Sequence, residues 1–388
     1  MTPLKWFSGF LKKYRLAIVI GLVLMTVIVA CAIVNPYISG MIVDDVIQGG
    51  AYDLLPKLIG IMLAVTAVRA ILRYATQMMF ETCSQGVLYR MRDAVYRKLL
   101  QEDFAFYNRN RTGDLMSRQT GDMDAIRHFV AFVIYTVYEN ILMFIFALVM
   151  IFMVNVKLAL CMMAVLPFCL FTTYLQSKHV KPRFHECRQS FSSLNAFVQE
   201  NISGNRVVKA FAKEEYEKEK FEKENDKYRE AELGAASIWC RFVPIFELLS
   251  NLLMVVLILY GGYQVICGEM TLGNLVTVNG YLWMLSNPLR FAGWWVNDVQ
   301  RFITSVEKIY DTYSKEPDVK KPKKGIKRKE MQGNIEFRNV SYEVEGEDII
   351  HNISFSVEKG QTVGILGSTG AGKSTIMNLL CRFYDVTE

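Results

Sequence analysis

The sequence predicts a multi-pass α-helical membrane protein with a short α/β segment at its C-terminal end. Three observations support this prediction. Of the 388 residues, 52% are hydrophobic and 21% are charged. The charged residues avoid several runs of about 20 residues, the length that a helix needs to cross the hydrocarbon of a bilayer. Basic residues gather in alternate connections between these runs, and a glycine-rich stretch near the C-terminal end follows short β-branched segments.

Six membrane crossings are expected, four in uncharged runs and two that contain charged side chains. Arg69 and Arg73 lie in the second crossing and Glu139 in the third, while Glu247 lies in the fifth. Charged groups inside a bilayer are costly and are candidates for function. A position near the inner interface, or side chains that extend to it, is the alternative. The predicted spans cover approximately residues 16–40, 54–80, 129–154, 157–178, 243–267 and 270–292.

The positions of Lys and Arg predict the orientation, because loops rich in these residues stay in the cytoplasm. The N-terminal flank and the connection over residues 69–128 are basic, whereas the loops on the opposite side carry only Lys57 and Lys157. We therefore expect both ends of the chain in the cytoplasm. A cleaved signal peptide over residues 1–34 is the alternative, and the crossings that follow disfavour it.

The two long inner connections, residues 69–128 and 178–247, are rich in helix formers and poor in proline. If each folds into two helices of about 30 residues, a rise of 1.5 Å per residue gives arms of about 45 Å. We expect such arms to extend the crossings into the cytosol.

Basic segments flank the predicted bundle on both sides. The N-terminal stretch PLKWFSGFLKKYR is amphipathic, which predicts a helix at the cytoplasmic interface or a simple charged flank. Residues 314–332 are expected to form a linker, in which KKPKKGIKRK holds seven basic residues. We interpret it as a solvated tether near anionic headgroups, with a nucleic-acid patch as the alternative.

Composition argues against several other functions. The eight cysteines are scattered without a C-x-x-C pair, so they are expected to be small apolar fillers in helices. No pattern indicates a zinc site, a nucleophile triad or a pair of catalytic carboxylates. The net charge of +6 follows from the membrane topology and gives no reason to expect nucleic acid as a partner.

The stretch GSTGAGKST fits the pattern G-x-x-x-x-G-K-[ST], with an expected strand, QTVGIL, before it and a helix after it. Glycines let backbone N–H groups turn toward phosphate oxygens, and the helix start adds positive potential. Lys373 would hold the β- and γ-phosphates of ATP, and Ser374 would be the Mg²⁺ ligand. The predicted nucleotide-binding residues are Gly367, Ser368, Thr369, Gly370, Ala371, Gly372, Lys373, Ser374 and Thr375.

Hydrolysis of ATP also requires an acidic residue that helps to hold Mg²⁺ and a group that orients the attacking water. Only 13 residues follow Thr375, and neither group is expected among them. We predict no catalytic residue within this chain, which alone is expected to bind nucleotide without hydrolysing it.

These features in this order resemble the half-transporters of the ABC exporter family, of the bacterial multidrug or lipid-exporter type. FYNRNRTGDLMSRQTGDMDAI is similar to the family's first intracellular loop, ENISGNRVVKAFAKEEYEKEKF to its second, and IIHNISFSVEKGQTVGILGSTGAGKST to the start of its nucleotide-binding domain. The resemblance implies a transmembrane domain over residues 1–313, a linker over 314–332, and over 333–388 the N-terminal part of an α/β P-loop NTPase domain, truncated before the family's later elements.

The resemblance also implies a mechanism. Two halves, identical or different, would dimerise in the bacterial cytoplasmic membrane, with the nucleotide-binding domain in the cytoplasm. ATP with Mg²⁺ would close the dimer, and short helices near Thr112 to Gln119 and Phe211 to Phe221 would pass this closure to the crossings. The family's adenine-stacking aromatic is replaced by Val344, so either Tyr342 provides the adenine contact in its place or the contact with adenine is weaker.

The substrate stays open among small molecules, lipids and peptides. Trp283, Phe291, Trp294 and Trp295 of the late crossings suit a pocket for an apolar or cationic solute, or an interfacial aromatic belt. The leading hypothesis is a subunit of an ATP-driven exporter of an amphipathic or hydrophobic solute. The alternative is a natural short membrane partner that binds nucleotide or a full-length half-transporter without hydrolysis. The reading frame after codon 388 would distinguish the two.

Overall fold

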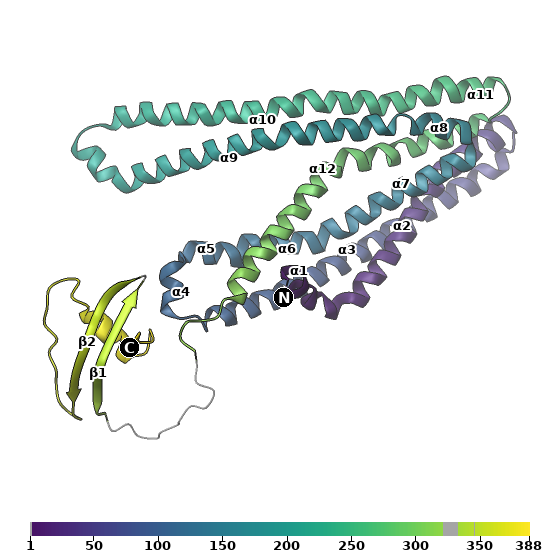
Figure 1. Ribbon diagram of the computed structural model, residues 1–388. Coiled ribbons are helices and arrows are strands. Elements are labelled where there is room, and N and C mark those ends of the chain that lie inside the picture. The colour runs from purple at the N-terminus through teal and green to yellow at the C-terminus, as the bar shows by residue number, and fades with distance from the viewer. Residues whose placement is uncertain (1, 321–332, 345) are drawn as a thin grey trace. The chain divides into compact units, whose positions relative to one another are not determined.

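The computed structural model describes residues 2–320, 333–344 and 346–388, which are mostly helical (Figure 1). Most of the predicted linker, residues 321–332, lies outside the described residues. Short π-helical turns at Ile42–Gln48, Arg118–Asp122, Phe129–Val133 and Leu257–Gly261 adjoin several helices. The helices are α1 Pro3–Leu11, α2 Arg15–Met41, α3 Leu55–Leu99, α4 Phe104–Arg109, α5 Thr112–Ser117, α6 Met123–His128, α7 Ile134–Val154, α8 Val156–Met163, α9 Leu166–Ala210, α10 Glu214–Val256, α11 Gly262–Ile266, α12 Leu272–Ser314 and α13 Lys373–Leu380; the strands are β1 Ile335–Val344 and β2 Glu347–Val357.

Five helical stretches in the described chain are long and apolar enough to cross a membrane: residues 3–48, 52–99, 112–154, 156–210 and 214–266. They contain the first five predicted crossings. The sixth predicted crossing lies in α12, which is an uninterrupted helix but is not among the five. Three asparagines, Asn274, Asn279 and Asn287, lower the apolarity of this helix. The multi-pass helical fold is confirmed, and the exact domain boundaries stay predictions.

The chain divides into two compact units. One comprises Met1–Lys13, Ser84–His128 and Arg301–Glu388, and the other comprises Tyr14–Cys83 and Phe129–Gln300. The second unit contains most of the apolar helices. The first contains the short helices α4 to α6, the end of α12 and the sheet.

In the second unit, α2 and α12 approach each other closely. A Cβ on Gly280 would lie 2.6 Å from Cβ of Pro36, and Gly273 faces the carbonyl oxygen of Gly40. The Tyr281 hydroxyl, fully buried, donates a hydrogen bond of 2.9 Å to the carbonyl oxygen of Ile33. In a membrane the hydrophobic effect does not drive helices together, because lipid is as apolar as their side chains. Small residues instead let the helix backbones approach closely and pack against each other. This contact belongs to a buried cluster that also includes side chains of α7, α8 and α10.

Turns that were predicted to share the outer side of the membrane meet in the second unit. The Asp44 carboxylate, after α2, accepts a hydrogen bond of 2.6 Å from the backbone N–H of Gly273 at the start of α12. Lys157, at the start of α8, lies 3.1 Å from Glu269, which precedes α12. An exposed ion pair of this kind contributes little stability, but it places the two turns at one end of the bundle.

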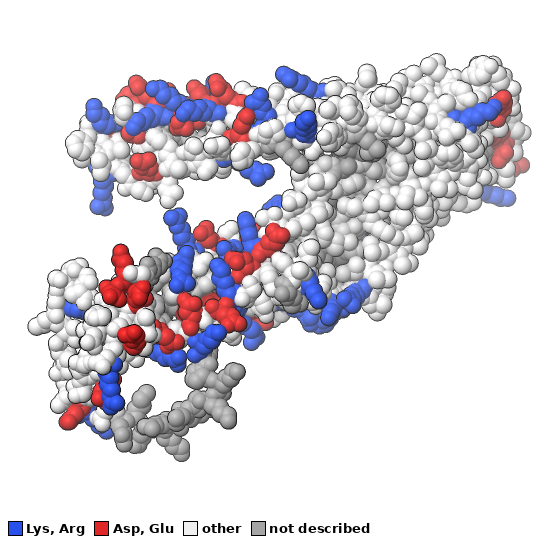
Figure 2. Space-filling model, in the orientation of Figure 1, with Lys and Arg blue, Asp and Glu red and all other residues white. Residues whose placement is uncertain are grey.

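The predicted second arm is confirmed as an antiparallel pair formed by α9 and α10 (Figure 1). These helices have 45 and 43 residues, and a helix of that length spans about 65 Å. The chain reverses at residues 211–213, within the predicted tip. Lys, Arg, Asp and Glu gather toward that end of the pair, whereas the surface from the middle of the pair toward α8 and α11 is mostly uncharged, with a few charged residues at the far end (Figure 2).

The N-terminal segment forms the predicted amphipathic helix, α1, but its apolar face is covered by protein. Trp6 and Phe7 are buried. The Trp6 ring lies 5.0 Å from that of Tyr313, and the Phe7 ring lies 5.0 Å from that of Phe302, both on α12. Within the first unit, α1 therefore packs against the end of α12, and its two buried aromatic rings do not face lipid.

The sheet differs from the prediction at one segment. β1 and β2 lie in the short β-branched segments before the glycine-rich stretch and pair with each other in an antiparallel register. QTVGIL was predicted as a strand but forms no regular secondary structure, and Leu366 is 96% exposed. A strand requires a neighbour for its backbone hydrogen bonds. In the described part of this segment, β1 and β2 form their ladder of backbone hydrogen bonds with each other, and QTVGIL pairs with neither. The prediction of a strand at QTVGIL is therefore wrong.

The cysteines follow their predicted role only in part. All eight are free thiols; Cys83 and Cys169 are buried among helices, as expected of small apolar fillers. Cys240, Cys267 and Cys381 are exposed on the described part of the chain.

Replacing Gly280 with Ala is expected to destabilise the contact between α2 and α12. The added Cβ would overlap Pro36, and overpacking of this kind costs about 1–3 kcal/mol. Thermal unfolding of the detergent-solubilised chain should show a lower midpoint. Gly293→Ala is the matched control on the same helix, since nothing lies within 4 Å of the added Cβ. Equal midpoints for both variants would contradict the close approach.

Candidate functional site

The glycine-rich loop has the backbone conformation that its sequence predicts. Gly370 and Gly372 have φ values of 89° and 79°, in the left-handed region that favours glycine. Gly372 precedes the first residue of α13. A Cβ at Gly372 would lie 3.1 Å from the carbonyl oxygen of Ile349 and 3.2 Å from Ile350. Both the conformation and the space at this position therefore require glycine.

Lys373 folds back over the loop. Its ammonium group donates hydrogen bonds of 2.8 Å to the carbonyl oxygen of Gly367 and 2.6 Å to that of Ser368. The positive charge is thus held at the mouth of the loop, beside the N-terminal end of α13. The first amides of a helix lack intrahelical partners and carry partial positive charge. Ser374 lies in the same first turn and is exposed. This arrangement suits the phosphates of a nucleotide.

Tyr342, the predicted adenine contact, lies one strand away from the loop. It pairs in register with Ile350 of β2, the residue that Gly372 approaches. Its ring packs 5.6 Å from that of Tyr384. Burial, and next the nearby Tyr384, raise the pKa of Tyr342 above its usual value. The structure thus places Tyr342 near the end of the loop, with one side of its ring covered by Tyr384.

A short helix just before the predicted tip contacts the C-terminal segment, residues 346–388. The contact comes from α4, where the Phe104 ring stacks on Phe383 at 4.2 Å and the Asn108 amide donates to the Tyr384 hydroxyl at 2.9 Å. The predicted tip, Thr112 to Gln119, instead begins with α5. The available signal was Asp103, a helix N-cap residue directly before α4.

Asp103 also binds the segment that leaves α12. One carboxylate oxygen accepts the N–H of Phe106 at 2.8 Å, and the other accepts those of Asp318 at 2.5 Å and Val319 at 3.2 Å. Burial would raise the pKa of Asp103, but these three hydrogen bonds and the nearby Arg109 outweigh it and lower the pKa. The charged carboxylate therefore joins two segments that are 215 residues apart.

The charged residues of the predicted crossings are partly brought together. Arg73 of α3 forms an ion pair with Glu139 of α7, whose side chain is 7% exposed. Arg69 lies one turn earlier on α3, and Glu247 is exposed on α10. The ion pair keeps the Glu139 carboxylate within the described bundle, and a position of these residues near the inner interface stays a prediction.

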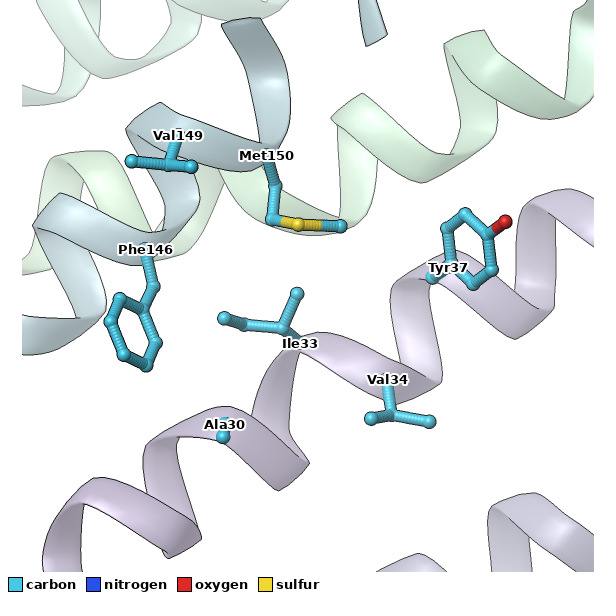
Figure 3. Close-up of a pocket in the computed structure, with 7 residues that line it drawn as sticks. All are labelled: Ala30, Ile33, Val34, Tyr37, Phe146, Val149 and Met150. Atoms are coloured by element: carbon cyan, nitrogen blue, oxygen red, sulfur yellow. The ribbon is translucent and has the colours of Figure 1, made fainter. Parts of the chain in front are cut away.

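An apolar pocket of about 340 Å³ lies between α2 and α7 (Figure 3). It does not include the late aromatic residues that were considered for a pocket; of these, Trp294 packs 6.3 Å from both Trp239 and Phe291. Sequence interpretation missed this pocket, because its residues read as ordinary apolar positions of crossings. The lining residues are Ala30, Ile33, Val34 and Tyr37 of α2 and Phe146, Val149 and Met150 of α7.

Long apolar helices and a phosphate-binding type of loop in one chain define a membrane protein with a nucleotide-binding segment. Residues 18–289 match the family model of the ABC transporter transmembrane region, and residues 350–388 match that of the ABC transporter. The chain therefore belongs to the ABC transporter family of ATP-binding/permease proteins.

Named relatives cover almost the whole chain. It is 33% identical, over 99% of its length, to the uncharacterized ABC transporter ATP-binding protein YknU of Bacillus subtilis, and spans 66% of that protein. It is 33% identical over 100% of its length to the probable multidrug resistance ABC transporter ATP-binding/permease protein YheI of Bacillus subtilis, spanning 67% of it. It is 27% identical over 89% of its length to the ATP-dependent lipid A-core flippase of Syntrophus aciditrophicus, spanning 57% of it.

Replacing Asp103 with Ser is expected to release the segment after α12 while α4 stays formed. Serine remains a good N-cap but does not supply the second carboxylate oxygen. Hydrogen exchange at the amides of Asp318 and Val319 should become about tenfold faster, as expected for loss of a hydrogen bond to a charged group. The Phe106 amide should stay protected.

The same contact predicts a pH dependence. The pKa of Asp103 is lowered in the folded chain. Its contribution to the stability of this contact is therefore complete above the ordinary Asp pKa of about 3.9. This contribution is lost as the pH falls through the lower pKa of the folded chain.

For the exchange experiment with Asp103→Ser, Asp114→Ser is the matched control, since Asp114 is exposed in the first turn of α5. Equal exchange at Asp318 and Val319 in both variants would rule out this role of Asp103.

Proposed function

We propose that this chain is a subunit of an ATP-driven exporter that moves an amphipathic or hydrophobic solute out of the cytoplasm. The observation that carries the proposal is the loop before α13, where left-handed glycines and the folded-back Lys373 form a cradle for phosphate. Membership of the family supports ATP as the ligand. Relatives named for multidrug resistance, lipid A-core and fatty acid transport support an apolar or amphipathic solute.

In this proposal each residue of the loop has a distinct role. The backbone N–H groups near Gly370 and Gly372 would face the phosphate oxygens, because both glycines have left-handed backbone conformations. Lys373 exchanges its two carbonyl acceptors for the β- and γ-phosphates. The Ser374 hydroxyl would hold Mg²⁺, whose charge offsets that of the phosphates. Tyr342 would contact adenine in place of an aromatic at Val344.

The proposed route from ATP to the membrane passes through α4 and the tip between α9 and α10. The stacking of Phe104 on Phe383 supports α4 as the part that follows the nucleotide-binding segment. We propose that a second half-transporter, identical or different, completes the ATP site and the solute path. The basic inner connections support a bacterial cytoplasmic membrane location with the N-terminus and the ATP loop in the cytoplasm.

Replacing Lys373 with Ala should weaken ATP binding by the chain about tenfold or more, because a charged hydrogen-bond donor to the phosphates is lost. Photolabelling with an azido derivative of ATP, titrated with unlabelled ATP, measures this directly. Binding is the appropriate readout, since hydrolysis depends on further groups beyond the loop.

Lys359→Ala provides the control, because Lys359 is an exposed lysine of the same segment and its removal changes the net charge equally. It should leave ATP binding unchanged. If Lys373→Ala binds ATP as tightly as Lys359→Ala does, the assignment of the loop is wrong.

A further inference from the structure

We propose that Gln264 of α11 is an internal hydration site, whose side-chain amide binds water when the turn over residues 267–271 opens and thereby favours the open form. This turn, which we call the outer turn, joins α11 to α12 at the predicted outer end of the bundle (Figure 1). The inference deepens the proposed function and rests on it, because an exporter has to open at its outer end to release a solute. It concerns side chains of the second unit alone.

The amide of Gln264 is buried without a partner. The residue is 2% exposed, and neither its Oε1 nor its Nε2 has a hydrogen-bond partner in the described chain. A glutamine amide has one acceptor oxygen and two N–H donors. Burying such groups unpaired destabilises the conformation that buries them. The closed form of the outer turn therefore carries a cost that a hydrated form does not.

The side chains around this part of the helix are apolar. Gln264 follows Gly261 by three residues, so the two lie on the same face. A Cβ on Gly261 would lie 3.3 Å from Met270, 3.4 Å from Leu257 and 3.5 Å from Leu275. Met270 and Leu257 are 6% and 1% exposed and belong to the buried cluster of the second unit. Water can reach the amide only where this apolar cover moves.

The end of the helix does not use the Gln264 side chain. The N–H of Glu269 donates to the backbone carbonyl oxygen of Gln264 at 2.9 Å, and that of Gly268 donates to the carbonyl oxygen of Val265 at 3.1 Å. Gly268 has a φ of 76°, so α11 ends in a Schellman motif. Backbone groups and a left-handed glycine thus form the cap, and the side-chain amide of Gln264 is left for another partner.

The outer turn carries the cover with it. Met270 belongs to this turn, next to Glu269, whose ion pair with Lys157 is exposed on both sides and contributes little stability. An opening of the turn moves Met270 away from the face that it covers and admits water to Gln264. A second copy of the chain would need the same opening to reach an amide in a residue that is 2% exposed, so water is the partner that fits.

Hydrogen exchange of the full chain in detergent tests the proposal at the amides of Gly268 and Glu269, whose hydrogen bonds cap α11. Gln264→Leu should slow this exchange about tenfold, because leucine has a similar volume and leaves no unpaired amide in the closed form. The midpoint of thermal unfolding should rise as well, whereas loss of a stabilising glutamine would lower it. Gln264→Met, a second variant without an amide, should change both quantities in the same direction.

Gln48→Leu is the matched control, since Gln48 is exposed on the π-helical turn after α2, also at the predicted outer end. The proposal is wrong if both Gln264 variants exchange at the rate of Gln48→Leu. It is also wrong if they exchange faster and unfold at a lower temperature, since Gln264 would then stabilise the closed form. Because ATP and solute are left out, a negative result leaves the assignment of the ATP loop intact, and failure of Lys373→Ala to weaken ATP binding would leave this site intact.

Discussion

The backbone hydrogen bond in hydrocarbon is the constraint on which this structure depends. A chain inside a bilayer has to satisfy every N–H and C=O within itself, and helices do so without a neighbour. Helices that form for this reason need not end at the membrane surface. α3, α9, α10 and α12 have 43 to 45 residues each, about twice the length that a crossing requires. The arms are therefore continuous with the crossings, and a displacement at an arm tip is carried along a single helix.

Long helices transmit force only where their ends are held. In the second unit, the contact of Gly280 with Pro36 and the cap of Asp44 on Gly273 fix α12 to α2 through backbone proximity. In the first unit, Asp103 connects the start of α4 to the chain that leaves α12. A charged hydrogen bond is stronger than a neutral one, and one carboxylate with three N–H donors suits a joint between two segments that lie far apart in the sequence.

The sequence predicts those parts of the fold that depend on local composition. Uncharged runs predict the crossings, and the spacing of Gly367, Gly372 and Lys373 predicts the loop, because in both cases the physics acts within one segment. It fails where the outcome depends on a distant partner. QTVGIL has strand composition, yet β1 and β2 pair with each other. Whether Glu139 meets Arg73 depends on the packing of α3 against α7, which no local pattern contains. The ATP loop was therefore predictable, and the charged cluster was visible only as separate residues.

The charged cluster also bears on why a bundle of apolar helices keeps arginines at all. A buried ion pair alone is weak evidence for stability, since apolar residues of similar volume often stabilise a protein equally well. A neutral pair would leave little reason for a second arginine one turn away. Arg69 adds a second positive charge, which Glu139, already paired with Arg73, does not balance. An unbalanced charge inside a bilayer costs free energy, so helix packing alone gives no reason for this arginine.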